Sequence, residues 1–129
     1  MEHTIEHRVS YKETDRMGVV YYSNYLVWFE IARTEFFRIR GIEYKRLEEE
    51  DKIFLPVTEA YCRYRAPINY DDVIQVIVKL NEMKAKRITF GYEVKKEGKT
   101  TSTGHTKHTF INEEGKAVPV PEKIASSFQ

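Results

Sequence analysis

The sequence predicts an α+β domain in which one long helix lies against a five-stranded antiparallel sheet. Three features lead to this prediction: apolar and polar side chains alternate in five segments, apolar side chains recur at helical spacing in one long segment, and the connections between the later strands are short. The chain has 129 residues, of which 41% are hydrophobic, which is enough for one core but not for two. We therefore expect residues 1–129 to form a single domain.

The first strand and the long helix show two different periods. A strand is expected at residues 4–11, where alternate side chains are apolar or aromatic. The helix is expected at residues 24–40, where Ser23 or Asn24 would cap the N-terminus and Gly41 suits the left-handed position that ends a helix. The apolar positions that recur every three or four residues in this helix are Tyr25, Phe29, Ala32, Phe36 and Ile39.

The rest of the chain predicts a short helix at residues 43–50 and four more strands. These strands are expected at residues 54–64, 73–80, 87–95 and 100–111. Because the connections between them are short, we expect the four strands to pair as an antiparallel meander.

The predicted sheet is wider than the predicted helix. Five strands spaced about 4.8 Å apart form a sheet about 24 Å wide, whereas one helix is about 10–12 Å across. A single helix therefore cannot cover the sheet if the sheet stays flat. We expect the sheet to curl around the helix and to bury its remaining apolar surface and edges against a second copy of the chain.

Composition excludes several classes of function. The chain has 21 Lys and Arg against 20 Asp and Glu, so it lacks the strong positive field that attracts nucleic acid or an anionic membrane. The longest uncharged stretch, residues 17–29, is shorter than the about 20 apolar residues that a membrane-spanning helix needs. With a single cysteine, Cys62, and no apolar leader, the sequence predicts a reduced cytoplasmic protein.

One segment carries a candidate for catalysis. Asp15 lies in a glycine-containing loop just before the expected helix, whose first backbone N–H groups lack partners within the helix. A carboxylate beside such amides suits acyl transfer, because the carboxylate attacks or activates water while an amide stabilises the oxyanion. The same residues also fit an ordinary loop in which Asp15 forms an Asx turn. Nearby aromatic side chains would supply either apolar pocket walls or core: Tyr21, Tyr22, Tyr25, Trp28 and Phe29.

A longer pattern adds to this interpretation. The run Asp-Arg-Met-Gly-Val-Val-Tyr-Tyr-Ser-Asn-Tyr at residues 15–25, followed by Phe29 and Ala32-Arg33, resembles the opening of the 4-hydroxybenzoyl-CoA thioesterase family. The resemblance continues at residues 68–73 and covers nearly the whole chain. It implies the hotdog fold, an acyl-CoA substrate, no cofactor, and a homodimer or a dimer of dimers whose sites are shared between subunits.

The resemblance also implies roles for individual residues. Asp15 would be the nucleophile or general base, and the backbone amide of Tyr22 would polarise the thioester carbonyl. Relatives often have His where this chain has Tyr22, so any contribution from an imidazole is missing here, whereas the amide is retained. The substrate pocket is expected at Gly18, Val19, Tyr25, Phe29 and Glu59, where Glu59 would orient water in a partner's site.

Other candidates concern phosphate and metal. Basic side chains at the turn between the third and fourth strands could hold the phosphates of CoA, although surface turns are often basic. The candidates for CoA binding are Lys84, Lys86, Arg87 and Arg63, with Arg65 a further choice. The four histidines are badly spaced for a metal site, so no metal is expected.

Two alternatives to an acyl-CoA thioesterase stay open. One is a thioesterase acting on acyl carrier protein, because both carriers are anionic near the thioester. The other is a non-catalytic acyl-CoA binding module that kept the fold. An assay of thiol release distinguishes an enzyme from a binding module.

Overall fold

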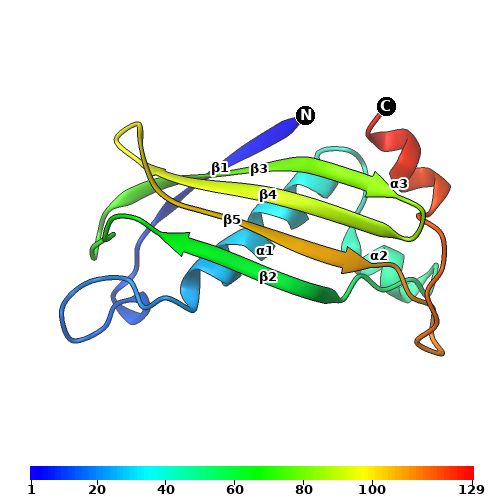
Figure 1. The fold of residues 1–129 in the computed structure, drawn as a ribbon, viewed down its shortest axis with the longest axis horizontal. Helices are drawn as coiled ribbons and strands as arrows, with labels where there is room; N and C mark the ends of the chain where they lie inside the picture. The colour runs from blue at the N-terminus through cyan, green and yellow to red at the C-terminus, as the bar shows by residue number, and fades with distance from the viewer.

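The structure is a computed structural model that describes residues 1–129, and it confirms a five-stranded antiparallel sheet with few helices. The strands are β1 (Glu2–Arg8), β2 (Val57–Tyr64), β3 (Val73–Lys84), β4 (Arg87–Lys96) and β5 (Lys99–Thr109). The helices are α1 (Asn24–Arg38), α2 (Tyr44–Glu49) and α3 (Glu122–Ser127), with a 3-10 turn η1 (Tyr11–Glu13). The sheet lies in one layer and α1 lies on one of its faces (Figure 1). None of the helices is long and apolar enough to span a membrane.

The order of strands in the sheet is β1-β3-β4-β5-β2, so the expected meander is wrong for one strand. Strands β3, β4 and β5 form the meander, but β2 pairs with β5 and lies at the edge opposite β1. The connection at residues 65–72 does not form a hairpin, because its backbone bonds with the N-terminal loop instead. The N–H of Val20 donates to the carbonyl of Ile68 at 2.8 Å, and the N–H of Tyr70 donates to that of Gly18 at 3.2 Å.

Several ends of elements differ from the expected ones. β1 stops at Arg8, because Ser10 and Glu13 form a capping box that turns the next residues into η1. β3 extends beyond Leu80 to Lys84 through a register shift. β2 begins only at Val57. Neither expected residue caps α1, which begins after Ser23 in helical conformation without a side-chain cap.

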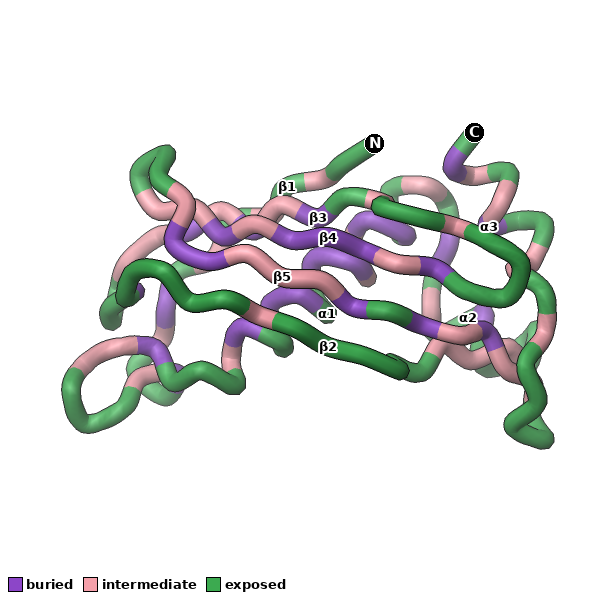
Figure 2. The backbone as a smooth tube through the Cα atoms, viewed as in Figure 1, coloured by how far each residue is buried: buried purple, intermediate pink, exposed green.

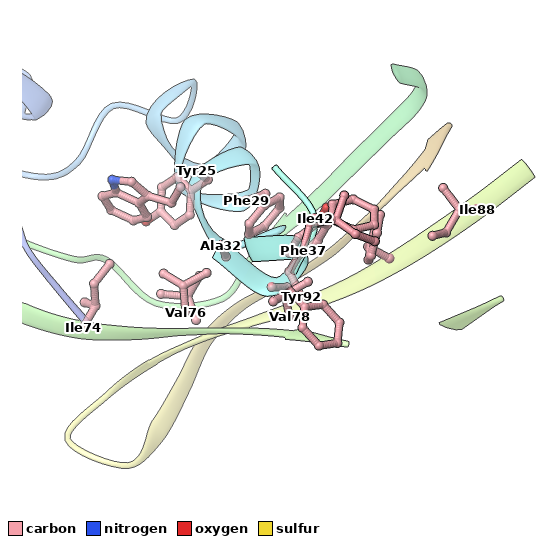
Figure 3. Close-up of a cluster of buried hydrophobic side chains, with 14 of the residues drawn as sticks. Tyr25, Phe29, Ala32, Phe37, Ile42, Ile74, Val76, Val78, Ile88 and Tyr92 are labelled. Carbon is pink, nitrogen blue, oxygen red and sulfur yellow. The ribbon is translucent and has the colours of Figure 1, made fainter. Parts of the chain in front are cut away.

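The core lies between α1 and the sheet (Figures 2 and 3). Alternate residues of β3 and β4 face α1 and are buried, as their alternation predicted: Ile74, Val76 and Val78 on β3, and Ile88, Phe90, Tyr92 and Val94 on β4. The ring of Phe29 stacks on that of Tyr92 with centroids 4.2 Å apart. Burying a side chain of this size stabilises the fold by about 1.5–3 kcal/mol.

The edge strand β2 is left largely uncovered. Every residue of β2 except Cys62 is exposed, and Figure 2 shows this strand as exposed along nearly its whole length. On α1, Leu26, Val27 and Ile31 are exposed apolar side chains at 40%, 54% and 40%. One chain therefore leaves both an unpaired sheet edge and an apolar helix face open to solvent.

Candidate active site

The loop that carries Asp15 is a small closed hairpin. Thr14 pairs with Val20, and the N–H of Asp15 donates to the carbonyl of Val19 at 2.9 Å. The side chain of Asp15 is part of an Asx turn, because its Oδ1 accepts from the N–H of Met17 at 2.8 Å and from that of Val19 at 3.4 Å. Its Oδ2 has no partner in the protein and Asp15 is exposed in the single chain. One carboxylate oxygen thus holds the loop, while the other accepts no hydrogen bond from the protein.

A buried carboxylate connects this loop to β1 and to α1. Glu13 is 8% exposed, and its carboxylate accepts from the N–H of Ser10 at 2.8 Å, from His7 Nε2 at 2.9 Å and from Trp28 Nε1 at 2.7 Å. Burial by itself would raise the pKa of Glu13, but these hydrogen bonds outweigh burial and hold the pKa below its usual value. Its carbonyl accepts from the N–H of Tyr21 at 2.8 Å and from Asn24 Nδ2 at 2.9 Å. Glu13 therefore fixes the Asp15 loop to the beginning of α1.

The sequence interpretation did not single out Glu13. The spacing Ser10-x-x-Glu13 is that of a capping box and was the available signal. Its three donors come from β1, from the residue before η1 and from the second turn of α1, and only the folded chain brings these together.

The amide expected to stabilise an oxyanion is free. Around the beginning of α1, the N–H of Tyr21 donates to Glu13, that of Asn24 to Tyr21 at 3.1 Å, and that of Tyr25 to Tyr22 at 3.3 Å. The N–H groups of Tyr22 and Ser23 donate to no acceptor in the protein. Such unpaired amides carry partial positive charge and favour an anionic oxygen.

An apolar hollow of about 340 Å³ lies beside this amide. It is lined by Val19, Val20, Tyr22, Tyr25, Tyr64, Arg65, Ala66 and Pro67. The rings of Tyr25 and Tyr64 meet edge to face at 4.8 Å, and the hydroxyl of Tyr64 donates to the carbonyl of Tyr22 at 3.2 Å. Burial raises the pKa of each of these two phenols to about 12, so both are neutral walls at physiological pH.

Of the seven expected catalytic and pocket residues, three line this hollow and four do not: Asp15, Gly18, Phe29 and Glu59. Val19, Tyr22 and Tyr25 line it, and Gly18 is in the adjoining turn, where its φ of +79° suits glycine. Phe29 is fully buried in the core and lines no hollow, because the stacking on Tyr92 turns its ring toward the sheet.

Glu59 lies away from the hollow. Its side chain contacts His105 at 2.7 Å and Lys107 at 3.6 Å on β5, and the hydrogen bond to His105 is the main cause that lowers its pKa. Tyr64 lines the hollow five residues further along β2, about 17 Å away. The structure contains no group of three or more His, Cys, Asp or Glu side chains that could hold a metal ion.

Three of the basic residues expected to bind CoA, Lys84, Lys86 and Arg87, lie at the other end of the sheet, whereas Arg63 directly precedes Tyr64, which lines the hollow beside Tyr22. Lys84 and Arg87 line a polar hollow of about 300 Å³ together with Lys107, whereas Lys86 and Arg63 do not line it. β3 runs from Val73, beside the N-terminal loop, to Lys84, which is about 36 Å at 3.3 Å per residue. A single chain therefore does not bring this cluster to Asp15. The cation that lines the hollow beside Tyr22 is Arg65.

Removing the Glu13 carboxylate is expected to destabilise the protein. In Glu13→Ala, the buried donors of Ser10 and Trp28 lose their acceptor, which should lower the free energy of unfolding by about 2 kcal/mol at pH 7. Because the pKa of Glu13 is lowered by folding, its contribution is present above the usual value of 4.5 and is lost as pH falls through the lower folded value. Urea unfolding between pH 7 and pH 3 measures the free energy of unfolding of the wild-type protein and of Glu13→Ala. The difference between these two free energies should narrow as the pH falls below 4.5.

The matched control for this prediction is Glu6→Ala on β1. Glu6 is exposed and makes no ion pair, so this change should alter the free energy of unfolding by less than about 0.5 kcal/mol. An equal effect of the two substitutions would contradict the role of Glu13 as the anchor of the loop.

A comparison with known protein families shows the superfamily to which this chain belongs. A family model described as the Thioesterase-like superfamily matches residues 9–128. The chain belongs to this superfamily.

Individual members of the superfamily are similar over nearly their whole length. The acyl-CoA thioesterase YbgC of Haemophilus influenzae is 31% identical over 123 residues, which are 94% of this chain and 90% of the relative. A hypothetical protein of Aquifex aeolicus has a TM-score of 0.94 at 35% identity, covering 98% of this chain and 99% of its own. A gentisyl-coenzyme A thioesterase has a TM-score of 0.89 at 28% identity, covering 95% of this chain and 99% of its own. The expected membership in the hotdog thioesterases is thus confirmed, and named homologues are acyl-CoA thioester hydrolases.

Proposed function

We propose that this superfamily member hydrolyses the thioester of a short-chain aliphatic or aromatic acyl-CoA to the free acid and CoA. The observation that carries the proposal is the unpaired amide of Tyr22 beside an apolar hollow, on a helix end to which Glu13 ties the Asp15 loop. The homologues named acyl-CoA thioesterase and gentisyl-coenzyme A thioesterase support the same chemistry.

In the proposed mechanism, the thioester carbonyl oxygen accepts a hydrogen bond from the Tyr22 N–H. Oδ2 of Asp15 attacks the acyl carbon, or removes a proton from the water that does so, and the carbon–sulfur bond breaks. The thiolate of CoA leaves and takes up a proton, and the acid forms directly or by hydrolysis of an acyl-aspartate. An amide positioned in this way contributes on the order of 3 kcal/mol to lowering the barrier.

We propose that a second copy of the chain completes the site. Asp15 is exposed in one chain, whereas a carboxylate that attacks a carbonyl reacts best when bulk water is kept away. The unpaired edge of β2 and the exposed side chains Leu26, Val27 and Ile31 provide a surface for pairing. The arrangement that we propose is a homodimer, or a dimer of dimers, of single hotdog domains in which each sheet wraps around its long helix. The partner would then bring Glu59 and the basic cluster at Lys84 toward the site.

Thiol release from a panel of acyl-CoA esters tests the proposed function. The expected result is turnover of at least one short aliphatic or aromatic ester, with slower release from the same acyl group on acyl carrier protein. Faster release from the carrier protein would favour the first alternative function. Saturable binding of acyl-CoA without thiol release would show that the protein is a binding module and would refute the proposed hydrolase activity.

A double charge reversal tests the CoA contacts. Lys86→Glu with Arg87→Glu is expected to raise the KM for an acyl-CoA about tenfold, because each change replaces attraction to a phosphate by repulsion. The KM for the N-acetylcysteamine thioester of the same acid, which has no phosphates, should stay unchanged. Lys45→Glu on the exposed side of α2 is the control and should affect neither substrate. An equal rise for both thioesters would count against phosphate binding.

A further inference from the structure

A second hollow, separate from the one beside Tyr22, is lined by a largely buried cation that has no ion pair. The hollow has a volume of about 470 Å³, and its apolar wall is formed by Phe54, Leu55, Pro56 and Ile111, from the segments that precede β2 and follow β5. Arg33 of α1 lines it as well, although Arg33 is only 8% exposed. The Nε of Arg33 is fully buried and has no hydrogen-bond partner, and Arg33 makes no ion pair.

The buried titratable groups packed around this guanidinium are uncharged at pH 7: the phenols of Tyr44 and Tyr92 and the imidazole of His108. Burial raises the pKa of Tyr44 well above its usual value, and it also raises that of Tyr92, while the charge of Arg33 and hydrogen bonding from its guanidinium oppose both shifts. Burial lowers the pKa of His108 to about 4, and the neighbouring Arg33 lowers it further, so the imidazole is uncharged at pH 7. No negative charge within the core therefore balances Arg33, and a buried charge without a partner is strongly unfavourable.

Two carboxylates stand at the hollow, Glu30 and Glu48, and both are exposed. Neither forms an ion pair with Arg33, although Glu30 lies one turn before it on α1. Their charges oppose the entry of multiply charged anions such as phosphates. A single carboxylate that brings its own apolar group is the ligand that suits both the walls and the cation.

We propose that this hollow binds a carboxylate carried on a short apolar chain or ring, with Arg33 as its ligand. A guanidinium pairs with a carboxylate through two parallel N–H···O hydrogen bonds, and this geometry gives Arg its preference for that group. The side chains of Phe54, Leu55 and Ile111 would pack on the apolar part of the ligand. Binding would supply the counter-charge that the core lacks.

Two sources would present this chemistry. One is a free monocarboxylic acid. The other is the far end of a dicarboxylic acyl group whose thioester lies at the Tyr22 amide, since Tyr22 lies just before α1 and Arg33 lies about 14 Å along the axis of α1 from its first residue, Asn24. Only the second source depends on the proposed hydrolase function.

Binding to the full chain is measured by isothermal titration with hexanoate and, as a neutral probe of the same shape, hexanamide. We expect hexanoate to bind the wild-type protein at least about tenfold more tightly than hexanamide. Arg33→Met should weaken hexanoate binding by about tenfold or more, whereas Glu30→Gln should leave it unchanged or strengthen it. Equal affinities of the two probes for the wild-type protein, or no heat with either, would overturn the proposal even if Arg33→Met fails to fold.

A catalytic comparison then separates the two sources. If the hollow receives the end of the substrate, kcat/KM for adipoyl-CoA should exceed that for hexanoyl-CoA by about tenfold, and Arg33→Met should remove this preference. Charge-dependent hexanoate binding without such a preference would assign the site to a free acid. If no acyl-CoA ester of the panel is hydrolysed, the proposed function fails while the titration still decides the carboxylate site.

Discussion

Replacing Asp15 by asparagine is expected to lower kcat for acyl-CoA hydrolysis by about 1,000-fold while leaving the fold intact. Asparagine keeps an Oδ1 that can accept from the N–H groups of Met17 and Val19, so the Asx turn and the loop should persist. It lacks the anionic oxygen that the proposed mechanism requires at Oδ2. Thiol release with saturating acyl-CoA gives kcat, and thermal unfolding checks that the Tm is unchanged.

The control for this change is Asp71→Asn. Asp71 is another exposed aspartate, paired only with Arg8 at 3.4 Å, and its φ of +70° is one that asparagine tolerates. We expect wild-type kcat for this control. Near-normal turnover by Asp15→Asn would remove Asp15 from the mechanism and leave the Asx turn as its role.

Replacing Gly104 by alanine is expected to cause the largest loss of stability, about 3 kcal/mol or more of the free energy of unfolding. A Cβ at this position in β5 would lie 2.4 Å from the backbone oxygen of Tyr61 and 2.6 Å from the ring of Phe29. The backbone of the neighbouring strand β2 cannot give way without breaking its pairing, and Phe29 is held by its stacking on Tyr92. Urea denaturation measures the effect.

Gly91→Ala is the matched control on the neighbouring strand β4. Its Cβ would meet the Asn81 side chain, with the closest atom at 2.6 Å. That side chain is partly exposed to solvent and can rotate away, so we expect a loss of less than about 1 kcal/mol. If Gly104→Ala and Gly91→Ala lowered the free energy of unfolding equally, the space between Gly104 and Phe29 would not be as tight as the structure indicates.

Local patterns predicted most of the elements and part of the site. The alternation in β3 and β4 predicted the buried face correctly, because a period of two places alternate side chains on one face wherever the strand pairs. The helical spacing correctly predicted that Tyr25, Phe29, Ala32 and Phe36 are buried, but it was wrong for Ile39, which follows the end of α1 and is 57% exposed. The predicted meander was wrong for β2. A short connection favours a hairpin in general, but its length does not reveal that the backbone of residues 65–72 bonds with the N-terminal loop instead.

In the site too, features set by neighbouring residues could be predicted, whereas features set by distant residues could not. That Val19, Tyr22 and Tyr25 lie around one hollow could be predicted, because they come from a loop and a helix end that are adjacent in sequence. Glu13 could not be singled out, since its importance comes from donors on β1, just before η1 and on α1.

By itself, the sequence determined the five strands and the helices α1 and α2, though not α3 or η1, together with the sheet face that is buried and the loop that precedes α1, since all of these depend on residues close together in the chain. Only the tertiary structure decided which strand lies at the edge, which carboxylate anchors the loop and that Arg33 is buried without a counter-charge. Those properties depend on contacts between residues far apart in the sequence. The strand pairing and core packing of the whole domain create these contacts, and no short stretch of sequence specifies them.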